Sequence, residues 1–521
     1  MPGYEEHLVA DFKTGKFLSK EPWLGPADAF PTLVNAYVDK GVLKKRKGVD
    51  TFMDVHASES DDIVGMGSVV TKGYHELIVA TETRIAQIHK NKTATYLFKP
   101  TGGSALSGGE HDYFWYQQFY GSLYFCNSVN PIIKYTPPGT TADWMDTGDV
   151  TIQTCQLLLQ YKNRLLVIGP TIGDAYYHNY LYYTDVNDDN IKATNFVKAQ
   201  TDAAAVTGGY IGETPVVFMS DGTIYHIEYT QNSDAPFTWL RKQPADFAAA
   251  ARMGIAPFKQ GLAVMGQTSL FRYDGYECKE FDVPIRGIMD EMDADNINNC
   301  YMHRFKDRNF IAIAYTSSGG SHHDRMLLYN LDEANFSTND IAANCLHSIA
   351  GPWSNFLQTP GDYPYPPADG DYEQYELFGT TAGKIYQMNS GYDDADQETN
   401  ITTDIRSIWM NPYSQEGKKC KLGWIKFLMH GGSGSGFQIS LYKDHREEAF
   451  KTIQVDCKGS IKNWEQVYIG GEVGSFFRIK IVNTYETYIT GSDFGIHAML
   501  FAFKRAGRIG ERTQYVSELP G

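Results

Sequence analysis

The chain is poor in cysteine, in charge and in long apolar runs. Seven cysteines occur in 521 residues, an odd number with no Cys-x-x-Cys pair, and charged residues make up 21%. This pattern favours free thiols in a reducing cytoplasm over a disulfide framework, and it offers no Cys/His metal site. Residues 1–17 lack the apolar stretch of a secretory signal. No run approaches the ~20 apolar residues of a membrane span, so the sequence predicts no such span.

Positive charge is also scarce. The chain has 46 basic and 62 acidic residues, which gives a formal net charge of −16. A protein that grips nucleic acid neutralises phosphates with clustered lysines and arginines, so this balance argues against such a grip. The acidic charge balance does not exclude a protein that nucleic acid passes without binding. The simpler interpretation is an acidic surface that keeps the protein soluble.

Aromatic residues and turn residues are abundant. Aromatics make up 14% of the chain, with 35 Tyr and 28 Phe, and 49 Gly and 21 Pro separate short apolar runs. This composition favours strands over helices. The clearest unit spans residues 215–227, where Asp221-Gly222 supplies the positive φ angles of a tight turn between two apolar strands. We therefore expect a β-hairpin there.

Weaker copies of this hairpin recur between residues 51 and 395. The second strands of seven such hairpins begin at residues 85, 123, 165, 224, 270, 311 and 385. A spacing of about 40–50 residues between short strands is typical of β-propeller blades. The sequence thus predicts an all-β protein whose residues 51–395 form a propeller of about six blades. Five or seven blades, or a stack of separate sandwiches, are the alternatives.

The two ends of the chain do not repeat the hairpin. Residues 396–505 contain longer alternating strands, at 422–428, 437–442, 476–482 and 496–503, which predict one antiparallel β-sandwich. Residues 1–50 hold an alternating strand and are predicted to be a separate docking segment. The polar residues 506–521 are expected to form an extended tail.

A basic run ends the N-terminal segment. It consists of Lys44, Lys45, Arg46 and Lys47. Lysines often protect the edge of a sheet, and this is the simpler interpretation. A docking surface for an acidic partner is the functional alternative.

No catalytic template fits the sequence. Residues 431–436 have the composition of a nucleophile elbow but lack Gly-x-Ser-x-Gly spacing, and no phosphate-binding loop or sialidase Asp box occurs. The oxygen-rich run 185–190 lacks the Gly and Glu of an EF-hand loop, and His322-His323-Asp324 is a weak candidate for metal or acid–base chemistry. We therefore predict no catalytic, metal-binding or cofactor-binding residue, and no enzymatic activity.

Acidic loops form the remaining candidate feature. We interpret them as solvated surface loops or as the lining of an acidic channel. The residues concerned are Asp188, Asp189, Asp290, Glu291, Asp293, Asp393 and Asp394.

Short motifs at both ends resemble a known family. Asn35 in its strand, followed by Gly41-Val42-Leu43 and Lys45-Arg46-x-Gly48, is similar to the opening of tail nozzle proteins of short-tailed bacteriophages. Residues 326–330, 351–353 and 375–388 resemble the last blade of those proteins. Residues 420–505 resemble the C-terminal domain of the packaged-DNA stabilisation (tail hub) proteins.

This resemblance implies a structural role in the virion. Such proteins form a homohexameric ring below the portal and adaptor, at the distal end of the tail, after assembly in the bacterial cytoplasm. The ring contacts the tail adaptor and the fibre, spike or needle proteins. It retains packaged double-stranded DNA and later lets it pass without specific binding. The alternative function is a glycan-binding or glycan-hydrolysing propeller.

Overall fold

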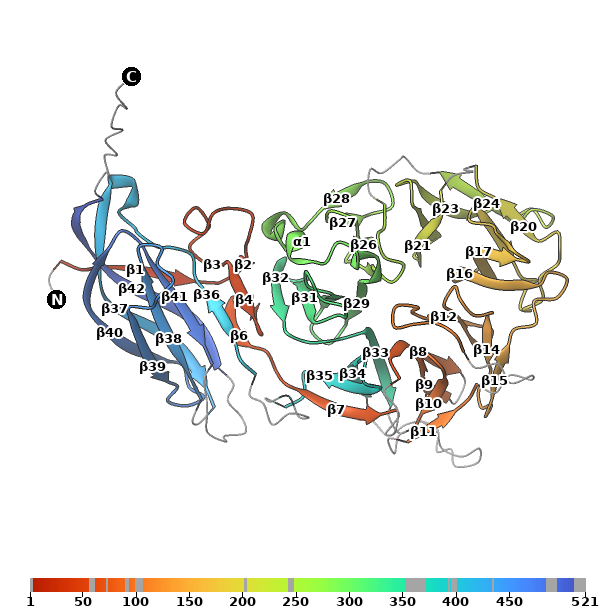
Figure 1. The fold of residues 1–521 in the computed structure, drawn as a ribbon, viewed down its shortest axis with the longest axis horizontal. Helices are drawn as coiled ribbons and strands as arrows, with labels where there is room; N and C mark the ends of the chain where they lie inside the picture. The colour runs from red at the N-terminus through yellow and green to blue at the C-terminus, as the bar shows by residue number, and fades with distance from the viewer. Residues whose placement is uncertain are drawn as a thin grey trace, which may run out of the picture.

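The computed structural model shows an almost entirely β-stranded protein in which a ring of sheets lies beside a sandwich (Figure 1). It describes residues 3–55, 61–71, 74–89, 93–98, 106–200, 204–241, 248–352, 372–391, 394, 401–432, 435–483 and 494–509. Both described ends of the chain lie in the sandwich (Figure 1). No helix of these residues is long and apolar enough to cross a membrane.

The ring is a β-propeller of seven four-stranded blades, one more than the expected six. The first three blades follow one another along the chain. Blade 1 contains β8 (Ile63–Thr71), β9 (Tyr74–Thr81), β10 (Ile85–Ile88) and β11 (Ala94–Tyr96). Blade 2 contains β12 (Trp115–Phe119), β13 (Ser122–Cys126), β14 (Ile133–Tyr135) and β15 (Ala142–Trp144). Blade 3 contains β16 (Ile152–Tyr161), β17 (Arg164–Ile172), β19 (Tyr180–Tyr183) and β20 (Phe196–Lys198), with β18 (Ala175–Tyr176) beside β17.

Four further blades complete the ring. Blade 4 contains β21 (Val206–Ile211), β22 (Pro215–Met219), β23 (Ile224–Tyr229) and β24 (Phe237–Arg241). Blade 5 contains β25 (Ile255–Pro257), β26 (Leu262–Met265), β27 (Leu270–Tyr273) and β28 (Cys278–Glu280). Blade 6 contains β29 (Tyr301–Phe305), β30 (Phe310–Tyr315), β31 (Arg325–Asn330) and β32 (Asn335–Asn339). Blade 7 contains β33 (Cys345–Pro352), β34 (Tyr372–Gly379), β35 (Lys384–Met388) and β7 (Val49–Asp54). Short helices η1 (Val283–Ile285), α1 (Ile288–Glu291) and η2 (Ile297–Asn299) join blades 5 and 6.

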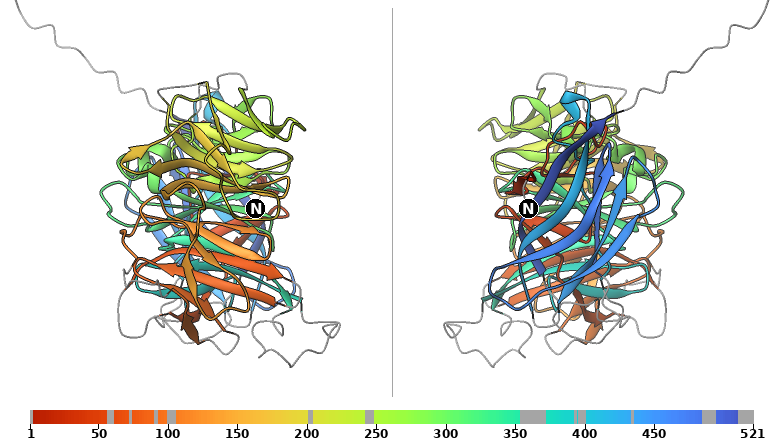
Figure 2. Two further views of the ribbon diagram at one scale, coloured as in Figure 1. Left: turned by 90° about the vertical axis from the view of Figure 1, so that its right-hand side faces the viewer. Right: turned by 90° about the vertical axis from the view of Figure 1, so that its left-hand side faces the viewer.

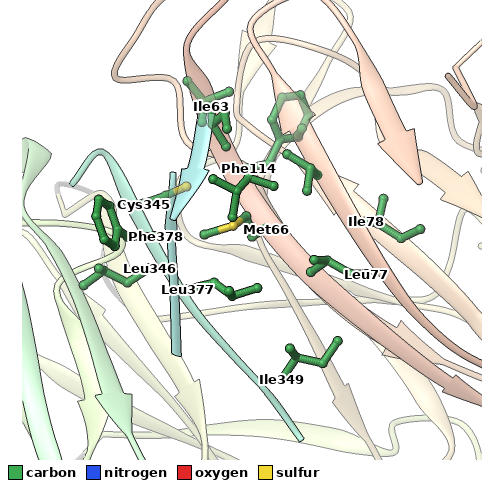
Figure 3. Packing of buried hydrophobic residues seen from close by; sticks show 14 of the residues in the cluster. Ile63, Met66, Leu77, Ile78, Phe114, Cys345, Leu346, Ile349, Leu377 and Phe378 are labelled. Atoms are coloured by element: carbon green, nitrogen blue, oxygen red, sulfur yellow. The ribbon is translucent and has the colours of Figure 1, made fainter. Parts of the chain in front are cut away.

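The ring is closed by a strand from the N-terminal part of the chain. Strand β7, which precedes blade 1, pairs with β35 as the outer strand of blade 7. The inner strands of successive blades pack side by side, and β33 of blade 7 packs against β8 of blade 1. Figure 3 shows the core at this closure, where Met66 and Leu77 of blade 1 lie near Ile349 and Leu377 of blade 7. Because the blades repeat around the ring, each sheet keeps only a short, protected outer edge.

The hairpin at 215–227 shows why each blade strand appears in the sequence as a short apolar run. Gly222 has φ of +80° and its N–H donates to the Met219 carbonyl at 3.0 Å, which confirms a turn at this position, with the positive φ at Gly222 and not at Asp221. All five residues of β22 are buried because both faces of a blade are covered. Val217 packs toward blade 3, whereas Phe218 packs toward blade 5.

The second body is a β-sandwich, as predicted. One sheet has the order β40 (Asn463–Gly474), β37 (Lys418–Gly431), β42 (Phe494–Arg508), β6 (Val42–Lys45) and β5 (Ala36–Asp39), with β1 (Glu5–Ala10) also paired to β42. The facing sheet has the order β36 (Asp404–Arg406), β41 (Phe477–Val482), β38 (Gly436–Lys443) and β39 (Lys451–Asp456). We call them sheet 1 and sheet 2. Turn η4 (Ser414–Glu416) leads into β37. The right-hand view of Figure 2 looks onto the long strands of the sandwich.

The N-terminal segment is not a separate unit. Strands β1, β5 and β6 complete sheet 1, while β4 (Thr32–Val34) pairs with β32 of blade 6 and with β36 of sheet 2. One hydrogen-bonded sheet therefore runs from blade 6 into the sandwich. Strands β2 (Gly15–Lys16) and β3 (Ala29–Phe30) flank this junction. Strand β42 continues to Arg508, so residues 506–508 belong to the sandwich, and the expected tail beyond residue 509 lies outside the described residues.

Candidate functional sites

The basic run is part of the junction between propeller and sandwich. Arg46 donates from both terminal nitrogens to the Asp394 carboxylate, at 2.8 and 2.7 Å, and its Nε donates to Asn35 Oδ1 at 2.9 Å. Lys45 and Arg46 are only 2% and 6% exposed. The interpretation of these two side chains as a docking surface is therefore wrong, because they are buried inside the molecule. Lys44 pairs with Asp39 at 2.6 Å, and Lys47 is half-buried.

Asn35 joins the same network from a left-handed backbone position. Its φ is +55°, its side-chain nitrogen donates to the Thr402 carbonyl at 2.8 Å, and its oxygen also accepts from the Asp340 N–H at 3.0 Å. Asparagine tolerates this backbone region better than most residues. Two of the residues that carry the family resemblance, Asn35 and Arg46, thus hold the two bodies together.

The acidic candidates do not gather into one channel within the chain. Asp189 accepts from Lys134 at 2.5 Å and from the Tyr124 hydroxyl at 3.1 Å, between β19 and β20. Asp188 is its neighbour in the same connection and accepts from the Asp189 N–H. Glu291 pairs with Lys16 at 3.5 Å, close to the propeller–sandwich junction.

The other acidic candidates act locally. Asp290 lies in α1, and Asp293 accepts backbone N–H groups from Asp295 and Asn296. Asp394 belongs to the junction, and Asp393 lies outside the described residues. The described members occupy separate loops, which agrees with the interpretation as surface loops; the lining of a channel between several copies stays a prediction.

A cavity of about 330 Å³ occupies the centre of the propeller. Its walls come from the inner strands of blades 2, 4, 5, 6 and 7. The lining side chains are Trp115, Tyr116, Tyr210, Met253, Ile255, Ala256, Pro257, Tyr301, Met302, His303, Arg304, Lys306 and His347. None of them is a carboxylate, so the described lining cannot supply the pair of carboxyl groups that most glycosidases use.

Two neutral histidines stand in this cavity wall. Burial lowers the pKa of His347 to about 3 and that of His303 to about 4. The Tyr116 hydroxyl lies 3.0 Å from His347 Nδ1, and His303 Nε2 lies 2.9 Å from the Ser348 hydroxyl. Ser348 in turn donates to Glu376. The arrangement fixes the rings but offers no group that exchanges protons near neutral pH.

Glu376 is the carboxylate nearest to this network, and it is already saturated. It accepts from the backbone N–H groups of Lys306 and Asp307 at 2.9 and 3.0 Å and from the Gln374 amide at 2.8 Å. Burial raises its pKa. These bonds pin the β29–β30 turn to blade 7, so we assign Glu376 a structural role.

A cluster of acids and histidines lies where blades 1, 2 and 6 bring their connections together. His322 Nδ1 is 2.6 Å from one Glu110 oxygen, and His111 Nε2 is 3.3 Å from the other. Burial, followed by the nearby carboxylates of Glu82 and Glu110, raises the pKa of Asp62 to about 6. Of this cluster only His322 stood out in the sequence, because the other members come from separate connections. No group of three or more potential ligands among the described residues is arranged to hold a metal ion.

The outer surface of sheet 1 carries exposed apolar side chains. The strand register places Leu8, Leu500, Lys426 and Gln466 in one row across the sheet, with Trp424 opposite Tyr468 and Leu428 opposite Trp464 in the flanking rows. We define the apolar face as Leu8, Trp424, Leu428, Trp464, Tyr468 and Leu500. Leu8, Trp464 and Tyr468 are 61%, 48% and 63% exposed. Apolar patches of this kind mark protein interaction sites.

Two details indicate that the apolar face is ordered. The Tyr4 ring packs 4.9 Å from the Trp424 ring, and Lys426 pairs with Glu6 at 2.9 Å in the middle of the face. The indole N–H of Trp424 is buried and has no hydrogen-bond partner among the described residues. A buried Trp N–H group usually has a hydrogen-bond partner.

Comparisons with known proteins identify no family for this chain. No family model and no curated protein matches the chain. Among solved structures, the WD40 domain of Pan2 from Neurospora crassa is 8% identical with a TM-score of 0.38, covering 70% of this chain and 98% of that domain. BamB from Moraxella catarrhalis is 8% identical with a TM-score of 0.36, covering 68% and 90%. An exo-β-1,3-galactanase from Phanerochaete chrysosporium is 9% identical with a TM-score of 0.27, covering 88% and 99%. At these values the likeness says nothing about activity.

Proposed function

We propose that this protein is a wall subunit of the tail nozzle of a short-tailed bacteriophage. In this proposal six copies form a ring below the portal and adaptor, retain the packaged DNA and line its path during ejection. The observation that carries the proposal is the apolar face of sheet 1. A monomer that exposes two large aromatic rings and Leu8 on one face of a sheet gains by covering them with another protein surface.

Other observations support the same role. The junction around Arg46 and Asn35, and the sheet shared by blade 6 and the sandwich, make the two bodies one stiff block. A ring that withstands the pressure of packaged DNA needs such blocks. The net charge of −16, repeated in every copy, disfavours adhesion to passing phosphates.

The test is the assembly state of the full-length chain. Native mass spectrometry and electron microscopy should show six-membered rings at micromolar concentration, on their own or with the tail adaptor. A ring requires a head-to-tail interface that closes on itself. The double variant Trp464→Lys/Tyr468→Lys should leave only monomers. Tyr276→Lys is the matched control, because Tyr276 is an exposed aromatic residue of blade 5 outside the apolar face.

Two outcomes would contradict the proposal. One is a wild-type chain that stays monomeric even with the adaptor present. The other is a ring that survives both substitutions on the apolar face but is lost in the Tyr276→Lys control.

A glycan-hydrolysing propeller is the second candidate, and one observation favours it. A carboxyl group with a pKa near 6 next to other carboxylates, as found at Asp62, is typical of general acids. A hydrolase screen with polysaccharides should then give activity that Asp62→Asn removes. The same substitution at Asp307, an exposed carboxylate of the β29–β30 turn, should not change it. Absence of hydrolysis across the screen would remove this candidate.

A further inference from the structure

A large cavity lies on the outer surface of sheet 2, away from the apolar face. It has a volume of about 660 Å³ and lies between the turn at residues 21–24, the end of β36 and the β38–β39 turn. Three arginines line it, Arg406, Arg446 and Arg478, together with Trp23 and Trp409. We call it the arginine cavity. Its volume falls in the range of sites for small molecules.

Arg478 lies at the wall of this cavity and forms no ion pair with the described residues, although the charges of Asp404 and Glu447 act on it. Its guanidinium carbon lies 4.5 Å from the Trp409 ring centre and 5.1 Å from that of Tyr442. Its Nε is buried and lacks a hydrogen-bond partner, and no described carboxylate forms an ion pair with it. Burial and the positive charge of Arg406 lower its pKa. A desolvated guanidinium with open donors favours an anionic ligand.

The β38–β39 turn places a second arginine at the rim. Asp444 and His445 have φ of +55° and +59°, and the Arg446 N–H donates to the Lys443 carbonyl at 3.2 Å. The His445 ring packs 4.6 Å from Trp409, which anchors the turn to the cavity wall. Arg446 is exposed and makes no ion pair with the described residues, whereas Arg406 is held by Asp404 at 2.9 Å.

An exposed aromatic ring faces solvent at the same cavity. Trp23 is 48% exposed, and its turn is fixed because the Trp409 N–H donates to the Pro22 carbonyl at 3.1 Å. Glu21 and Glu447 also line the cavity. Their carboxylates can accept hydrogen bonds from hydroxyl groups. The cavity thus combines guanidinium donors, hydroxyl acceptors and an apolar ring face.

We propose that the arginine cavity binds an acidic oligosaccharide. A sugar carboxylate binds Arg478 and Arg446, the hydroxyl groups bind the two glutamates, and the apolar side of a sugar ring packs on Trp23. A nucleic acid fits less well, because Glu21 and Glu447 repel a chain of phosphates. An acidic peptide uses the arginines but leaves the hydroxyl acceptors without a role. The proposal does not depend on ring assembly.

The test is titration calorimetry on the full-length protein with oligosaccharides that contain uronic or sialic acid. The same sugars with the carboxyl group reduced to an alcohol should bind about tenfold more weakly or worse, since a charge-assisted pair is lost. Arg446→Gln and Trp23→Ala should each weaken binding of the acidic sugars by about tenfold. Arg505→Gln, an exposed arginine of β42 outside the cavity, is the matched control and should bind as the wild type does.

Three results would overturn the proposal. They are no binding of any acidic sugar, equal binding of the reduced sugars, and tighter binding of a polyglutamate peptide or a single-stranded DNA oligonucleotide. Arg446 and Trp23 lie at the surface, so both variants should fold. Arg478→Gln provides a further variant inside the cavity, with circular dichroism to check its fold. Mass measurement would show separately whether a variant still forms rings, and the sugar-binding test does not depend on that result.

Discussion

The propeller and the sandwich are both built from packed sheets, but they leave different surfaces to solvent. Each blade is covered on both faces by its neighbours, so that all five residues of β22 are buried. Each sandwich sheet is covered on one face only. The two outer surfaces of the sandwich then differ in chemistry: sheet 1 presents the apolar face, and sheet 2 presents the arginine cavity. The propeller supplies a stiff frame, and the two proposed binding functions lie on the sandwich.

The largest expected effect concerns ring closure in the propeller. Phe52 of β7 is buried, and its ring lies 5.8 Å from that of Tyr375 in blade 7. Phe52→Ala leaves a cavity at the closing strand and should lower the free energy of unfolding by about 3–5 kcal/mol. Urea denaturation measures this loss. Tyr276→Ala removes an exposed ring and should cost less than about 0.5 kcal/mol; equal losses in both variants would show that β7 does not close the ring.

The second-largest loss of stability is expected at the junction between the propeller and the sandwich. Arg46→Ala removes the cation that the Asp394 carboxylate pairs with and leaves the Asn35 oxygen with only the Asp340 N–H, and it should cost about 3 kcal/mol. Arg286→Ala breaks an exposed pair with Glu280 and should cost less than about 1 kcal/mol. Both are measured by chemical denaturation. An Arg46→Ala chain as stable as the control would mean that propeller and sandwich are joined by the shared sheet alone.

A smaller effect is expected from the acidic cluster of the propeller. The pKa of Asp62 is raised to about 6, above that of a carboxyl group in the unfolded chain, so the folded state holds this proton more tightly. Its contribution to the free energy of unfolding is therefore present at low pH and is lost as pH rises from about 4 to about 6. Asp62→Asn should remove this pH dependence and stabilise the protein by about 1 kcal/mol at neutral pH, because the group is half exposed.

Denaturation curves at several pH values test the Asp62 prediction. Asp307→Asn, on an exposed turn, should keep the pH dependence of the wild type. If Asp62→Asn unfolds with the same pH dependence as the wild type, that dependence comes from another group.

The smallest effect on stability should come from the apolar face. Trp464→Lys changes an exposed side chain on the face of sheet 1 that points away from the core. The free energy of unfolding of the monomer should therefore stay within about 0.5 kcal/mol of the wild type. The same change should weaken assembly strongly. Unfolding of the isolated monomer, compared with mass measurements, separates the two. A large loss of monomer stability would mean that Trp464 belongs to the fold and not to an interface.

Much of the fold could be predicted because its signals are local. The hairpin at 215–227 is confirmed, since an Asp-Gly turn between apolar runs acts within a few residues. The predicted count of six blades is one too low, because the strands used as markers occupy different positions in different blades. The seven marker strands are second strands in blades 2, 3 and 6 but third strands in blades 1, 4, 5 and 7, so their spacing is irregular. The closing strand β7 also lies far in sequence from the rest of blade 7.

The candidate sites could be predicted much less well. A run such as Lys44–Lys47 reads as surface because isolated charges avoid the interior. Arg46 is buried only because Asp394, almost 350 residues later, neutralises it. The sequence likewise contains Trp464 and Tyr468, but nothing local says that their side of the strand stays uncovered.

The strands, the turns and the all-β class follow from local patterns, because alternation and turn chemistry depend on neighbours in the chain. The scarcity of positive charge likewise follows from the composition alone. Long-range packing sets which charges are buried, how many blades close the ring and which sandwich surfaces remain free. The arginine cavity shows the physical reason. Trp23, Arg406, Arg446 and Arg478 meet only after the two ends of the chain pair in one sandwich.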